Sequence, residues 1–164
     1  MSHPNLQISL RVALSVIGLR LVLFFGRFEA EWLDTVYIYI NLAALPALAI
    51  YAIWPRGRAT GFLEDAKECL RLLGLYSIIM AAFFYVYYGA VDTEFFPSMH
   101  ERITFGEIEA SDENLNPEEV GSRVRSFFSL RNGTAIVLAA YMAFSLFYAV
   151  FFSAVKRAVP KVSR

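Results

Sequence analysis

The stretch Leu72–Ala90, LLGLYSIIMAAFFYVYYGA, contains no charged side chain and is the clearest structural signal in this chain. A helix needs about 20 mostly apolar residues to cross the roughly 30 Å of hydrocarbon in a bilayer. The stretch meets this requirement, and its continuous apolar run differs from the alternating segments of a membrane β-barrel. It is therefore predicted to be a membrane-spanning helix.

Three further windows have a similar length and apolar character. They are residues 12–28, which Arg20 interrupts, residues 33–54, and residues 133–155. The last of these windows carries no charge. Arg20 and the lack of a small-residue cleavage site favour an uncleaved span over a secretory signal peptide for the first window. We predict an all-α integral membrane protein, a four-helix bundle forming one membrane domain over residues 1–164.

Composition agrees with a chain that has the lipid bilayer as its solvent. Hydrophobic residues make up 57% of the chain and charged residues 18%, with a mean hydropathy of +0.48. Soluble domains are about half apolar and about a quarter charged. The 15 Lys and Arg residues balance 15 Asp and Glu residues, and Cys69 is the single cysteine. These numbers exclude a basic nucleic-acid binder and a disulfide scaffold.

Charge in the loops predicts the direction of insertion. The N-terminus, the loop at residues 55–71 and the tail after Val155 together hold nine basic residues and three acidic ones. The opposite side holds five basic and twelve acidic residues, most of them in residues 91–131. Because basic loops stay in the cytoplasm, both termini are expected there, and residues 91–131 are expected to be extracytoplasmic.

Arg20 is the most informative polar residue inside a predicted span. A charge at depth costs about 2.5–3.5 kcal/mol on insertion scales, so it faces protein or water, or reaches to the interface. Arg20 and Asn41 lie at similar predicted depths, and we expect Arg20 to point toward Asn41 or Tyr37. A structural or snorkelling arginine, a contact with a lipid phosphate or partner, and an anion path all remain open.

Small residues and a proline suggest how the spans pack. Ala135, Ala139 and Ala143 are spaced four residues apart and form a smooth ridge on one helix face. Close contact between small residues drives helix association in bilayers, so this ridge packs within the bundle or forms a dimer interface. Ser77 is a second polar residue within a span, and Pro46 is expected to kink the second span.

The segments outside the spans are predicted to form amphipathic helices. Residues 55–71 carry apolar residues at helical spacing, so this segment lies on the inner surface or runs directly into the third span. In the outer segment, Asn116 is a predicted N-cap followed by Pro117 at the first helical position. A helix to about Leu130 is expected there. A second amphipathic stretch is indicated by Phe95, Phe96, Met99, Ile103 and Phe105.

The third and fourth spans resemble those of a known family. The sequences FLEDAKECLRLLGLYSIIMAAFFYVYYGAVDTEFF, from residue 62, and LFYAVFFSAVKRA, from residue 146, are similar to the bacterial four-span membrane proteins catalogued as domain of unknown function 4199. This resemblance implies four helices and a location in the bacterial inner membrane. It implies no catalytic residues.

No motif for enzymatic chemistry accompanies these features. The EF-hand pattern, a zinc ligand set, a phosphate loop and a dinucleotide fingerprint do not occur in the sequence, so no metal or cofactor is expected. We expect a non-enzymatic accessory or structural subunit that binds other membrane proteins or itself. The alternative is a small transporter, channel or lipid-binding protein that uses Arg20, Asn41, Ser77 and the kinked second span.

Overall fold

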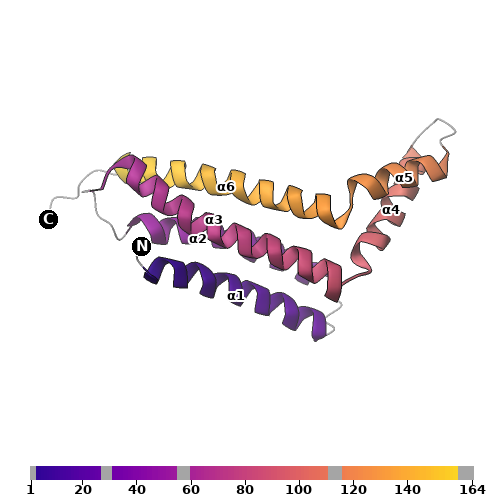
Figure 1. Cartoon of the computed structure of the whole chain (residues 1–164), viewed down its shortest axis with the longest axis horizontal. Coiled ribbons are helices and arrows are strands. Elements are labelled where there is room, and N and C mark those ends of the chain that lie inside the picture. Colours follow the sequence, from indigo (N-terminus) through magenta and orange to yellow (C-terminus); the bar gives the residue numbers. More distant parts are fainter. Residues whose placement is uncertain (1–2, 27–30, 55–59, 111–115, 159–164) are drawn as a thin grey trace. The chain divides into compact units, whose positions relative to one another are not determined.

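The computed structural model describes residues 3–26, 31–54, 60–110 and 116–158. Every regular element in these ranges is a helix, which confirms the predicted all-α class (Figure 1). In chain order the elements are α1 (His3–Phe25), α2 (Glu31–Ile53), α3 (Phe62–Val86), the short π-helix η2 (Tyr87–Val91), α4 (Phe95–Ala110), α5 (Pro117–Phe127) and α6 (Leu130–Ala158).

Four of the described helices are long and apolar enough to cross a membrane. They occupy Leu6–Phe25, Thr35–Ile53, Phe62–Val91 and Leu130–Ala158. These are the four helices that the sequence predicts, with shifted ends. The first window ends at Phe25 within the described residues, not at Phe28, and residues 27 and 28 lie outside them.

The third and fourth helices are longer than the apolar windows from which they were predicted. The amphipathic segment from Phe62 is continuous with the third span, so α3 is one helix and not a surface helix followed by a span. Likewise, α6 begins at Leu130 and ends at Ala158, three residues beyond the window at each end. A hydropathy window detects only residues that suit hydrocarbon, whereas backbone hydrogen bonding continues into the polar headgroup layer.

The chain forms two compact units, residues 1–80 with 139–164 and residues 81–138. The first contains α1, α2, most of α3 and the C-terminal two-thirds of α6. Its core holds mainly small and aliphatic side chains of α2 and α3, such as Leu45, Leu48 and Leu73. Large apolar side chains point outward on all four helices, including Leu14, Tyr39, Ile78 and Phe147. Such an outward apolar surface suits hydrocarbon as the solvent.

Helix α6 turns its polar side inward. Its buried residues, Tyr141, Ser145, Ala149, Ser153 and Lys156, are spaced three or four residues apart and so share one face. The outward face carries Met142, Phe144, Leu146, Phe147, Val150 and Phe151. This inversion is expected in lipid, because polar groups need partners that hydrocarbon does not supply.

In the second unit, α4 and α5 pack against each other. The predicted N-cap of α5 is confirmed: the Asn116 side chain accepts a hydrogen bond from the Glu118 N–H at 3.1 Å. Val120 and Val124 form the buried face of this helix. The helix ends at Phe127, so it does not merge with α6.

Aromatic residues at the end of α3, in η2 and at the start of α4 pack together in the second unit. The rings of Tyr88 and Phe95 lie 4.3 Å apart, and those of Phe84 and Phe96 lie 6.4 Å apart. Gly133 on α6 lets this cluster approach closely, since a Cβ at Gly133 would lie 3.0 Å from Cζ of Phe96. The His100 Nε2 atom lies 2.5 Å from the Phe128 carbonyl oxygen and links α4 to the end of α5.

Candidate functional site

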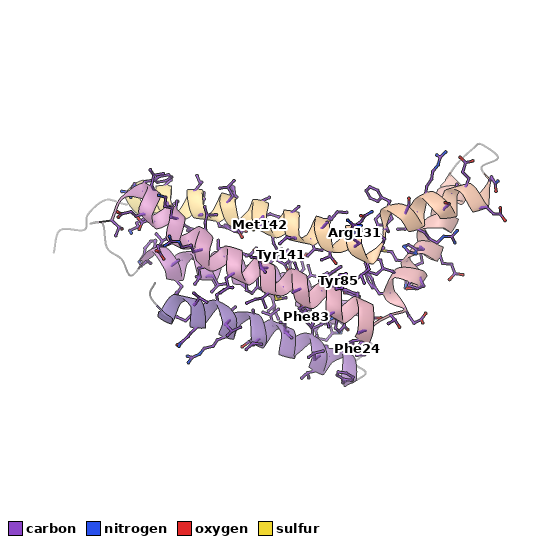
Figure 2. The ribbon with its side chains drawn as sticks, in the orientation of Figure 1. Phe24, Phe83, Tyr85, Arg131, Tyr141 and Met142 are labelled. Carbon is purple, nitrogen blue, oxygen red and sulfur yellow. The ribbon has the colours of Figure 1, made fainter. Side chains whose placement is uncertain are left out.

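Asn41 is the centre of a polar cluster inside the first unit. Its amide donates a hydrogen bond to the Tyr141 hydroxyl, and its side-chain oxygen accepts one from the Tyr76 hydroxyl at 2.5 Å. The rings of Tyr76 and Tyr141 meet edge to face with centroids 6.2 Å apart, and Tyr141 lies between α6 and α3 (Figure 2). This cluster joins α2, α3 and α6 and engages both ends of the Asn41 amide.

Ser77 takes part in a second contact between α3 and α6. Its hydroxyl donates to the Leu73 carbonyl at 2.8 Å and lies 3.1 Å from the Ser145 hydroxyl. Both serines are almost completely buried. On α1, the buried Ser9 hydroxyl donates to the Leu72 carbonyl of α3 at 2.9 Å. Short polar side chains therefore tie α3 to α1 and α6 by hydrogen bonds.

Arg20 lies over the ring of Tyr37, one of the two residues toward which the sequence predicts it to point. The guanidinium carbon is 5.3 Å from the centre of the Tyr37 ring, which is the geometry of a cation–π contact. Both side chains are half-buried. Asn41, the other predicted neighbour, bonds instead to the two tyrosines. The contact links α1 to α2 and accommodates the cation on an aromatic face.

The remaining predicted packing residues differ in their placement. Pro46 lies inside α2, which continues as one helix from Glu31 to Ile53. Ala135, Ala139 and Ala143 are all exposed on α6, so they do not supply the packing contacts of the bundle. The tyrosine and serine face of α6 supplies them instead, because its polar groups gain partners only when they turn inward.

Asp65 and Lys156 form a buried ion pair that the sequence analysis did not identify. The Lys156 Nζ lies 2.8 Å from Asp65 Oδ2, with 8% of the lysine side chain and none of the aspartate exposed. Thr60 bonds to both groups: its hydroxyl donates to Asp65 Oδ1 at 2.7 Å and accepts from Lys156 Nζ at 3.2 Å. The cluster fixes the start of α3 to the end of α6.

Arg157 adds a second cation to this cluster. Its Nη2 atom donates to the Thr60 carbonyl at 3.1 Å and lies 3.5 Å from Asp65 Oδ2. The guanidinium also lies over the Phe62 ring, 5.8 Å from its centre. We refer to Thr60, Asp65, Lys156 and Arg157 as the charged cluster. It contains one carboxylate and two cations.

A helical pattern in the sequence could have identified the charged cluster. Asp65 continues the buried stripe of α3 through Cys69, Leu72 and Tyr76, and Lys156 continues the stripe of α6 beyond Ser153. Charges that extend the buried faces of two helices are candidates for a pair. Hydropathy alone places both residues in surface segments, because each lies beyond an apolar window.

The polar side chains of the first unit make contacts between helices. Within the described ranges, no group of three or more His, Cys, Asp or Glu residues is placed to hold a metal ion. The polar groups of Asn41, Ser77 and Asp65 are engaged in bonds between helices. These bonds connect α1, α2, α3 and α6.

We expect Asp65→Asn to destabilise the protein by about 3 kcal/mol, because it leaves Lys156 buried without a counter-ion. The free energy of unfolding in mixed micelles measures this change. The double variant Asp65→Asn with Lys156→Met should recover part of the loss. Arg123→Gln, which breaks the exposed Arg123–Glu119 pair, is the matched control and should cost less than about 1 kcal/mol. Equal losses for Asp65→Asn and the control would contradict a stabilising role.

For the Asn41 cluster, a double-mutant cycle with Asn41→Leu and Tyr76→Phe should give a coupling energy of about 0.6 kcal/mol, and at most about 1.7 kcal/mol. Tyr148→Phe on α6 removes a hydroxyl that makes no hydrogen bond to a described residue, so its coupling to Asn41→Leu should be near zero. If both cycles gave zero coupling, the hydrogen bonds of Asn41 would contribute nothing to the free energy of unfolding of the bundle.

Comparison with known proteins adds no relative from which a function could be taken. The chain matches no protein-family model, no curated protein and no solved structure. The resemblance to the four-span family therefore stays a prediction, carried by the residues quoted for it.

Proposed function

We propose that this chain is a non-enzymatic accessory or structural subunit that binds another membrane protein or a second copy of itself. The observation that carries the proposal is the pairing of the polar groups inside the first unit. Asn41 and Ser77, which a transport path would need, bond to side chains of neighbouring helices. A substrate would have to break these bonds to use either residue.

The outward face of α6 supports binding to a partner within the membrane. Ala135, Ala139 and Ala143 are exposed there and lie four residues apart on one helix. A ridge of small side chains lets a second helix approach closely, and close van der Waals contact is a main source of helix association in lipid. Large side chains flank the ridge, among them Ile136, Met142 and Phe144.

We place the protein in the bacterial inner membrane with both termini in the cytoplasm. The charge asymmetry of the loops supports this orientation, with nine basic residues on one side and twelve acidic residues on the other. The exposed faces of α4 and α5 are then extracytoplasmic and available to a second protein.

Cysteine labelling tests the orientation. In a Cys69→Ser background, we expect Glu118→Cys to react with a membrane-impermeant maleimide in intact spheroplasts. Lys67→Cys should react only after permeabilisation. Both positions are exposed, so access to the reagent and not burial determines labelling. The reverse pattern would overturn the orientation.

Substitution on the α6 ridge tests the proposed association. We expect Ala139→Leu to reduce recovery of a stoichiometric partner, or of the homo-oligomer, from native membranes in mild detergent, because the larger side chain separates the two helices. Ala140→Leu is the matched control, because Ala140 is also exposed but lies about 100° around the helix from Ala139. The recovery of the partner or homo-oligomer with this variant should equal that with the wild type. Quantitative mass spectrometry measures the recovery.

A wild-type protein that is recovered only as a monomer would overturn the subunit proposal. Equal losses for Ala139→Leu and Ala140→Leu would place the association on another surface. Unfolding in mixed micelles should be the same for both variants, since neither residue lies in the core.

A further inference from the structure

The charged cluster carries more positive charge than its structural role requires. Asp65 is fully buried and supplies one negative charge, whereas Lys156 and Arg157 supply two positive charges around it. A single counter-ion would satisfy the carboxylate, and Lys156 already provides it at 2.8 Å. Arg157 therefore leaves a surplus of one positive charge at this end of the first unit.

Several N–H donors of the two cations have no acceptor among the residues that the structure describes. The Lys156 ammonium has three N–H donors, and two of them bond to Asp65 and Thr60. The Arg157 hydrogen bonds use only Nη2, which leaves Nε and Nη1 without an acceptor among the described residues. The arginine side chain is 38% exposed, so these donors are open to a ligand from outside.

The Arg157 side chain is already held in one orientation. The Phe62 ring supports its guanidinium, and the Thr60 carbonyl and Asp65 carboxylate bond to Nη2. A guanidinium presents its N–H groups as a planar fork that matches the oxygens of a phosphate. Because the side chain is fixed before binding, Arg157 would lose less conformational entropy when a ligand binds than an unrestrained surface arginine would.

The position of the cluster along α6 brings it to the depth of lipid phosphates. The 29 residues of α6 span about 43 Å at 1.5 Å per residue. A bilayer measures about 40–45 Å when its headgroup layers are included, so the last turn of α6 reaches the headgroup layer. Trp54, at the end of α2, is 57% exposed, and tryptophan is enriched at this interface.

Charges that neighbour the cluster in the sequence favour an anionic headgroup over a zwitterionic one. Arg56 and Arg58 precede Thr60 in the sequence and Lys161 and Arg164 follow Arg157, and neither stretch contains Asp or Glu. Of the neighbouring carboxylates, Glu68 pairs with Arg71 at 2.8 Å, and Glu64 accepts a hydrogen bond from the Gly61 N–H at 3.1 Å. The ammonium of a zwitterionic lipid would meet excess positive charge here.

We propose that the charged cluster is a binding site for the phosphate group of an anionic phospholipid, with Arg157 as the donor. Asp65 and Thr60 position the two cations and do not touch the lipid. The site lies at the bundle end where α3 begins and α6 ends. It is independent of the proposed association through the α6 ridge.

Native mass spectrometry of the full chain tests this site. The protein is released from nanodiscs that contain equal amounts of phosphatidylglycerol and phosphatidylcholine with the same acyl chains. We expect the wild type to retain phosphatidylglycerol preferentially and Arg157→Gln to retain about fivefold less, the effect of one basic residue near a charged membrane surface. Arg157→Lys, which keeps the charge but loses the fork, should lie between them.

Arg71→Gln is the matched control, since Arg71 is another exposed arginine of the first unit and pairs with Glu68. Its lipid retention should equal that of the wild type. Wild-type protein without a preference for phosphatidylglycerol, or equal retention by Arg157→Gln, would overturn the proposal. Displacement of the bound lipid by excess inorganic phosphate would also overturn it, because the site would then bind free phosphate. The circular dichroism spectrum of Arg157→Gln should match that of the wild type, because the ion pair between Asp65 and Lys156 remains in this variant.

Discussion

Hydrocarbon offers no hydrogen-bond partner, so each polar side chain within the bilayer must find one in the protein or reach the interface. This constraint explains the inward face of α6. In water, the aromatic and aliphatic side chains of α6 would form the core and its hydroxyls would face solvent. Here Tyr141 and Ser145 turn inward to Asn41 and Ser77, while Phe147 and Phe151 face outward.

The same constraint separates the interior contacts into two kinds. Near the middle of the helices, neutral groups pair with neutral groups, as Asn41 does with Tyr76 and Tyr141. At the end of the first unit, a carboxylate pairs with an ammonium. In the proposed placement this end lies near the headgroup layer, where a charge costs less than at the bilayer centre. Arg20 is the intermediate case, a cation held over the Tyr37 ring.

These contacts support a structural or accessory function and a separate lipid site at the bundle end. The proposed protein contact uses the outward ridge of α6, whose alanine side chains can associate only through van der Waals packing. The proposed lipid contact uses Arg157. Because Lys156 already pairs with Asp65, the positive charge and the remaining N–H donors of Arg157 are available to a lipid. The two surfaces differ in chemistry, and substitutions at Ala139 and Arg157 therefore separate them.

Local patterns are enough to predict the number and approximate position of the four apolar helices, the helical class and the N-cap at Asn116. These features depend on local hydropathy and local hydrogen bonding, which are visible in a single stretch of chain. Three features depend instead on contacts between distant segments: the face of α6 that turns inward, the bonds of Asn41 to two tyrosines, and the pairing of Asp65 with Lys156, 91 residues away. The alanine ridge left packing within the bundle and a dimer interface open. Within the bundle, the tyrosine and serine face of α6 makes the contacts, because the energy of pairing polar groups depends on partners from distant segments that no local pattern reveals.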